Sequence, residues 1–116
     1  MKFRLLTAML LALAATAGTA QDNVLNLYTA RHYQTDEAFY TNFTKQTGIK
    51  VNRIEGGEDA LFERIKTEGA NSPADVMIMV DAARLVSAAA AGITQPIASP
   101  VVAKEVPANL RDADNN

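Results

Sequence analysis

The alternation of short apolar segments with amphipathic ones is the feature that most limits how this chain can fold. Three segments have the character of strands and three that of helices, and they follow one another in turn: 24–29, 36–47, 49–54, 59–68, 76–80 and 82–91. Gly48, Gly69 and Gly92 stand where the three helices are expected to end. The pattern β-α-β-α-β-α with tight connections predicts an α/β fold with a parallel sheet and helices on its faces.

Three local signals refine this prediction. Thr35 and Asp36 offer a helix N-cap, and Phe39 and Phe43 lie four residues apart on one expected apolar helix face. Residues 76–80 are apolar without alternation, which is typical of a strand buried on both faces. After Gly92 the periodicity fades, and we expect an irregular segment with a short helical turn within 105–110.

The first twenty residues have the three regions of a secretory signal peptide. Lys2 and Arg4 form a basic start, residues 5–15 are an apolar run, and Gly18 and Ala20 are small residues at the expected cleavage site. The apolar run is too short to span a bilayer. We therefore predict export by residues 1–20 and a mature chain of residues 21–116.

Charge and composition exclude several classes of function. The formal net charge of −2 becomes −4 when Lys2 and Arg4 leave with the signal peptide, and no basic cluster is present to follow phosphates, so we expect no nucleic acid partner. The sequence has no cysteine, which excludes disulfides and thiolate metal sites. No nucleophile is paired with a base by any motif, so we expect no enzyme activity.

The strongest candidate for chemistry is the polar turn that carries Arg31, His32 and Tyr33. It follows the first expected strand, and ligands of open α/β sheets bind beyond the carboxyl ends of the strands. His32 is the single histidine of the chain. A phenolate is a hard anionic oxygen ligand and imidazole also serves iron. The turn suits a metal ion, although two adjacent residues cannot complete a coordination shell, and a plain surface turn is the alternative.

Other polar residues have simpler interpretations. Asp81 follows the third strand, where receiver domains carry a phosphoacceptor, but an N-cap for the next helix is the favoured interpretation. Arg31 can pair with an anion near a metal or with Asp36, and the sequence does not separate these. The acidic residues of the second helix start read most simply as a solvated face; they are Glu55, Glu58, Asp59 and Glu63.

Several motifs together resemble the periplasmic ferric-iron substrate-binding proteins of ABC importers, within the extracellular solute-binding proteins. They are the stretches 25–33, 47–51, 54–56, 63–66, 68–76 and 80–81, and the similarity covers about residues 24–114. The resemblance implies a type II periplasmic-binding-protein fold in which two α/β lobes close around Fe³⁺. Residues 21–116 would form a truncated N-terminal lobe.

The resemblance also implies the site and the partners. The metal ligands of this lobe would be His32 and Tyr33, with Arg31 beside them or holding a synergistic anion. Val80 stands where another branch of the family has an acidic ligand, and the remaining tyrosine ligands would come from a second lobe, beyond residue 116. The implied function is capture of ferric iron by a monomer and its delivery to an inner-membrane permease, incomplete in this chain.

Two alternatives stay open at this point. The same fold could bind another small solute, either an organic anion anchored by Arg31 or a cation complex. The chain could also be an exported interaction module without a ligand.

Overall fold

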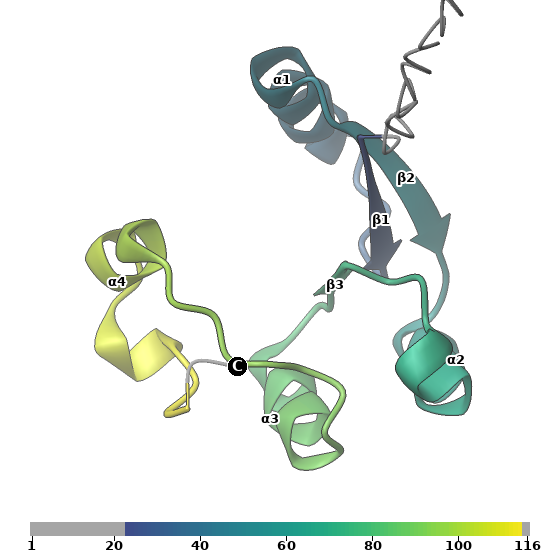
Figure 1. Ribbon diagram of the computed structural model, residues 1–116, viewed down its shortest axis with the longest axis vertical. Helices are drawn as coiled ribbons and strands as arrows, with labels where there is room; N and C mark the ends of the chain where they lie inside the picture. The colour runs from purple at the N-terminus through teal and green to yellow at the C-terminus, as the bar shows by residue number, and fades with distance from the viewer. Residues whose placement is uncertain (1–22, 115–116) are drawn as a thin grey trace, which may run out of the picture.

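The computed structural model describes residues 23–114, so the predicted signal peptide lies outside the described residues. The predicted alternation is confirmed: the elements are β1 (Val24–Thr29), α1 (Asp36–Thr47), β2 (Lys50–Glu55), α2 (Glu58–Glu68), β3 (Val76–Ile78), α3 (Ala82–Ala90) and α4 (Pro100–Glu105), with 3-10 turns at Gly69–Asn71 and Ala108–Leu110 (Figure 1).

The three strands form a parallel sheet in the order β2-β1-β3. β1 and β2 pair over their full lengths, from Val24 opposite Lys50 to Thr29 opposite Glu55. The Gly56 N–H donates to the Thr29 carbonyl at 3.3 Å, and the Ala30 N–H donates to the Ile78 carbonyl at 3.0 Å. β1 is therefore held from both sides at its carboxyl end, and all three strands end at one edge of the sheet.

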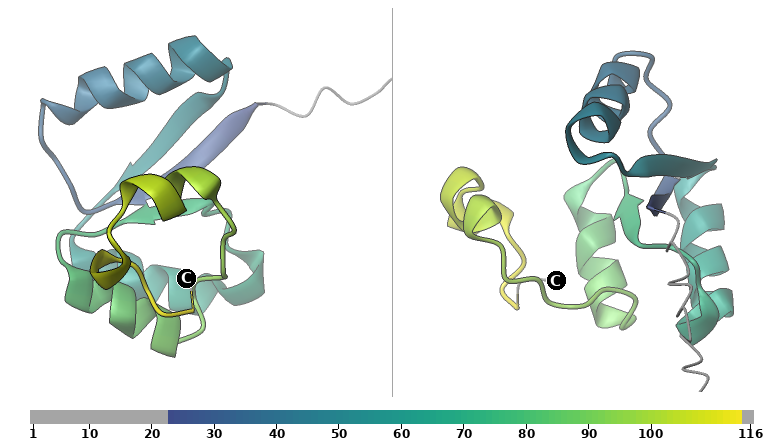
Figure 2. Two further views of the ribbon diagram at one scale, coloured as in Figure 1. Left: turned by 90° about the vertical axis from the view of Figure 1, so that its left-hand side faces the viewer. Right: turned by 45° about the horizontal axis from the view of Figure 1, so that its top comes forward.

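Helices cover both faces of the sheet. α1 lies on one face, and α2 and α3 lie on the other, while α4 and the C-terminal segment stand apart from the strands (Figure 2). The core under α2 contains Tyr28, which is fully buried, together with Ala30, Leu61 and Ile65. None of the helices between residues 23 and 114 is long and apolar enough to cross a membrane.

The prediction of a doubly buried third strand was wrong. β3 ends at Ile78, and Val76 and Val80 are 42% and 56% exposed. Val76 lies in register with Leu27, so both side chains are on one face. On that face α1 packs on β2, where Tyr40 lies over Arg53. The exposure of Val76 shows that the β3 side of this face is incompletely covered.

The predicted apolar face of α1 was also wrong. Phe39 is 67% exposed, whereas Tyr40 is 8% exposed and is the buried residue of this helix. The Arg53 guanidinium of β2 lies 4.9 Å from the centre of the Tyr40 ring. The helix thus turns an amphipathic aromatic ring toward a charged strand residue, which a search for apolar pairs does not detect.

The segment after Gly92 contains more helix than predicted. The Ser99 hydroxyl accepts a hydrogen bond from the Val102 N–H at 3.3 Å, and Pro100 occupies the first helical position of α4. Both are recognised signals of a helix start. α4 therefore occupies a stretch that we expected to be irregular.

Candidate cation site at the carboxyl edge of the sheet

The turn after β1 is fixed at both ends by hydrogen bonds. At its start the buried Thr29 hydroxyl accepts from the Arg31 N–H at 3.1 Å. At its end the Tyr33 carbonyl accepts from the Asp36 N–H at 2.9 Å, in the first turn of α1. Between these anchors the side chains of His32 and Tyr33 are 52% and 56% exposed. The turn thus holds both predicted ligands at the carboxyl edge of the sheet, open to solvent.

Arg31 lies against Tyr33 and is held there by Asp36. Its Nε and Nη2 donate to the two Asp36 carboxylate oxygens at 3.0 and 3.1 Å, and its guanidinium carbon is 4.9 Å from the centre of the Tyr33 ring. The hydrogen bonds from Arg31 lower the pKa of Asp36 below its usual value. Of the two uses left open for Arg31, the structure shows the pairing with Asp36.

This pairing explains why the predicted N-cap of α1 was wrong. Thr35 has helical backbone angles and its side chain makes no capping hydrogen bond. The Asp36 carboxylate is engaged by Arg31 instead of by the N-terminal amides of the helix. The start of α1 is therefore tied to the candidate site.

Glu55 is the residue of this region that the sequence analysis missed. One of its carboxylate oxygens, Oε2, lies 3.6 Å from the His32 Nδ1, and the other lies 3.6 Å from the Arg53 Nη1. The sequence predicts that Glu55 belongs to a solvated helix start, whereas in the structure it is the last residue of β2. The signal that could have located Glu55 is the equal length of the first two strands. Two parallel strands of equal length in full register end together, which places Glu55 opposite Thr29 and next to the turn.

The other acidic residues serve the scaffold. Glu58 accepts a hydrogen bond from the Val80 N–H at 2.5 Å, and both Glu58 and Asp59 form ion pairs with Arg84 of α3. The Asp81 carboxylate accepts from the N–H groups of Ala83 and Arg84 at 2.8 and 3.3 Å. The N-cap prediction for Asp81 is confirmed.

The edge of the sheet therefore presents the phenol of Tyr33 and the imidazole of His32, with the Glu55 carboxylate next to the imidazole. Oxygen and imidazole donors of this kind suit a hard or intermediate cation. No group of three histidine, cysteine or acidic side chains within residues 23–114 is arranged to hold a metal ion. A cation bound here would take part of its shell from other sources.

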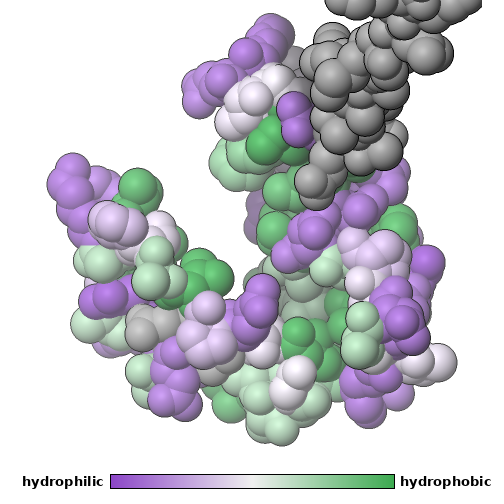
Figure 3. Space-filling model, in the orientation of Figure 1, coloured by the Kyte–Doolittle hydropathy of each residue, from purple (hydrophilic) through white to green (hydrophobic). Residues whose placement is uncertain are grey.

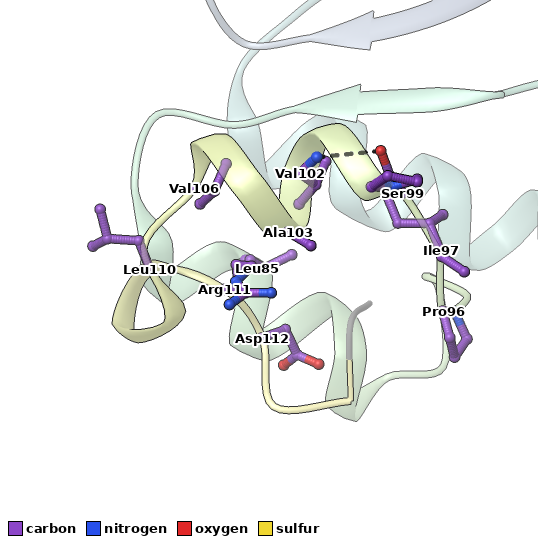
Figure 4. A pocket seen from close by; sticks show the side chains of 12 residues that line it. Leu85, Pro96, Ile97, Ser99, Val102, Ala103, Val106, Leu110, Arg111 and Asp112 are labelled. Atoms are coloured by element: carbon purple, nitrogen blue, oxygen red, sulfur yellow. Dashed lines mark hydrogen bonds between the residues drawn. The ribbon is translucent and has the colours of Figure 1, made fainter.

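A separate cavity of about 700 Å³ lies between α3 and the C-terminal segment. Its walls are mostly apolar, with Leu85, Val102 and Val106 among them (Figure 4). Apolar side chains also border the hollow between α4 and the part of the chain that carries the sheet (Figure 3). The cavity shares no residue with the turn and lacks the oxygen and imidazole donors found there.

Comparison with known proteins agrees with the fold and with the resemblance. The profile of the family described as bacterial extracellular solute-binding protein matches residues 28–116. The chain belongs to this family. The sequence is 54% identical to iron uptake protein A1 of Synechocystis sp. over 102 residues, which are 88% of this chain and 28% of the relative. It is 36% identical to the major ferric iron-binding protein of Neisseria gonorrhoeae over 76% of this chain and 27% of the relative.

Solved structures give the same result. The Trichodesmium protein FutA (IdiA) in complex with iron and citrate matches with a TM-score of 0.76 and 59% identity, over 79% of this chain and 29% of that one. The ferric binding protein from Campylobacter jejuni matches with a TM-score of 0.76 and 41% identity, over 78% of this chain and 29% of that protein. The periplasmic-binding-protein fold predicted from the resemblance is confirmed. The chain spans less than a third of the length of these relatives.

Proposed function

We propose that this chain is part of a ferric-iron-binding protein and that His32 and Tyr33 bind the Fe³⁺ cargo. One observation supports this most strongly: the two side chains stand exposed on a turn that is fixed to the central strand, in a chain similar over most of its length to proteins named for ferric iron. No reaction is needed for this function. The protein captures and releases an ion.

Tyr33 is the ligand whose chemistry favours Fe³⁺. A phenol must lose its proton to bind the ion strongly, and a bound cation drives that loss. The guanidinium carbon of the adjacent Arg31 lies 4.9 Å from the centre of the Tyr33 ring. Because Asp36 holds Arg31 with two hydrogen bonds, the guanidinium stays beside Tyr33. Arg31 is therefore a positioning residue rather than a ligand.

The rest of the coordination shell comes from outside this turn. Further protein ligands can come from parts of a two-lobed binding protein other than residues 23–114, and an anion can supply oxygen atoms. Citrate is named together with iron in the Trichodesmium structure. We expect the chain alone to hold Fe³⁺ weakly and more firmly when citrate occupies open positions.

Export and delivery belong to the same proposal. Residues 1–20 act as a signal peptide, residues 21–116 form part of the first lobe, and the iron-loaded protein is monomeric in the periplasm and passes its cargo to an inner-membrane ABC permease. An organic anion as the main cargo is less favoured. Such a ligand would need Arg31 as its anchor, and two of the guanidinium nitrogens already donate to Asp36.

Equilibrium dialysis tests the choice of cargo. The chain is dialysed against ferric citrate, against citrate alone and against gallium citrate, in which a trivalent ion of similar size replaces iron. We expect retention of both metal citrates and none of citrate alone, and His32→Ala should weaken the retention of iron about 10-fold or more. Equal binding of citrate with and without metal would contradict a cation site and support an anion-binding protein.

A further inference from the structure

Glu55 and the turn after β1 rise from the same edge of the sheet because β1 and β2 are parallel and end together. Thr29 is opposite Glu55, and the ladder continues by one bond, from the Gly56 N–H to the Thr29 carbonyl. Strand pairing therefore brings Glu55 and the turn that carries His32 to the same edge, although 23 positions separate the two residues in the sequence.

The orientation of the His32 ring follows from this contact. Nδ1 faces the Glu55 carboxylate at 3.6 Å, which is a charge contact slightly longer than a hydrogen bond, and Nε2 is on the other side of the ring. A histidine that binds a metal through one ring nitrogen commonly donates the N–H of the other to a carboxylate, which fixes the tautomer and the ring orientation. The side chains of His32 and Glu55 are 52% and 43% exposed, so the edge remains accessible to an ion.

Glu55 is itself held in place. Its second carboxylate oxygen lies 3.6 Å from the Arg53 Nη1, and the same nitrogen donates to Glu37 of α1 at 2.5 Å. Arg53 also lies over the buried Tyr40 ring. The Glu55 carboxylate is thus placed between a fixed cation on β2 and the imidazole of the turn.

We propose that Glu55 is the positioning residue for His32: its carboxylate favours the ring orientation and tautomer with N–H at Nδ1, which leaves Nε2 available to the Fe³⁺ cargo. This inference rests on the proposed function, since it assigns the ring nitrogen that binds the ion. Glu55 itself stays on the side of the ring away from the ion.

The tautomer of His32 tests this inference directly and without iron. His32 is the single histidine, so the imidazole nitrogens of the ¹⁵N-labelled chain report on this ring alone. At alkaline pH, where the ring carries one N–H, we expect mainly the Nδ1–H tautomer in the wild type. Glu55→Ala should shift the ring toward the Nε2–H form that free histidine prefers, while Glu55→Gln, which keeps an acceptor oxygen, should shift it less. The backbone amide spectrum of the same samples shows whether each variant is folded.

Glu63→Gln is the control, because it removes an exposed carboxylate whose ion pair is with Lys66 on α2 and which takes no part in the contacts that join His32, Glu55 and Arg53. We expect an unchanged tautomer in this variant, and a loss of ferric citrate affinity of about 10- to 100-fold only in Glu55→Ala. A wild type that binds no Fe³⁺ would overturn both proposals. A wild type that binds Fe³⁺, with the tautomer and affinity of Glu55→Ala unchanged, would overturn this one alone.

Discussion

At the scale of single residues, one carboxylate joins three parts of the chain behind the candidate site. Glu68 accepts hydrogen bonds from the hydroxyl of the buried Tyr28 at 2.9 and 3.0 Å, from the Arg64 Nε at 2.7 Å and from the Ser72 hydroxyl at 2.7 Å. β1, α2 and the segment leading to β3 therefore meet at a single side chain. The network gives the buried Tyr28 hydroxyl a hydrogen-bond partner. Without one, the desolvation of this hydroxyl would reduce the stability of the fold.

This network predicts a pH dependence of stability. Hydrogen bonds from Arg64 and Ser72 lower the pKa of Glu68 from its usual value of 4.5. A carboxyl whose pKa is lower in the folded state stabilises the fold fully above its unfolded pKa, and this stabilisation is lost as the pH falls through the folded value. Glu68→Gln should therefore reduce the free energy of unfolding at pH 7, and its difference from the wild type should shrink below pH 4.5.

Urea unfolding between pH 7 and pH 3 measures this difference. Glu63→Gln serves as control, because Glu63 is 66% exposed and pairs with Lys66 on the helix surface, and little change is expected at any pH. Parallel stability curves for the wild type and Glu68→Gln across the acid range would contradict the role given to this network.

At the scale of elements, the parts of the fold that local chemistry determines were predictable. The limits of β1 and α1 were predicted because the polar residues after Thr29 and the glycine after Thr47 are signals within the segment itself. The buried face of α1 and the short, partly exposed β3 were not predicted correctly. Both depend on which strand each helix covers, and no single segment contains that information. The Glu55–His32 contact required the register of two strands, which no single segment contains.

The end of α1 gives a test of one such local signal. Gly48 has φ of +74°, and its N–H donates to the Thr44 carbonyl at 2.8 Å. A β-carbon at Gly48 would meet nothing within 4 Å, so the cost of a side chain is conformational. Gly48→Ala should destabilise the fold by about 1 kcal/mol, and Gly48→Asn by less, because asparagine tolerates the left-handed region. Chemical denaturation of the three proteins measures this, and an alanine variant as stable as the wild type would show that the backbone relaxes there.

At the scale of the whole molecule, the candidate site lies at one edge of an α/β unit that matches less than a third of its relatives. The structural matches cover 78% and 79% of this chain but 29% of the solved proteins. The fold and the class of protein could be predicted because the motifs of the resemblance run along most of the chain. The complete coordination shell could not be predicted, because no group of three or more histidine, cysteine or acidic side chains within residues 23–114 is arranged to hold a metal ion.

The most direct test of the central claim is the visible spectrum of the chain with ferric citrate. A phenolate bound to Fe³⁺ gives a charge-transfer band, and the chain has three tyrosines. Tyr33 is 56% exposed at the edge of the sheet, whereas Tyr40 is the buried residue of α1. We predict a band for the wild type and for Tyr40→Phe, and its loss in Tyr33→Phe. A band that persists in Tyr33→Phe, or that Tyr40→Phe removes as well, would contradict the assignment of Tyr33 as the iron ligand.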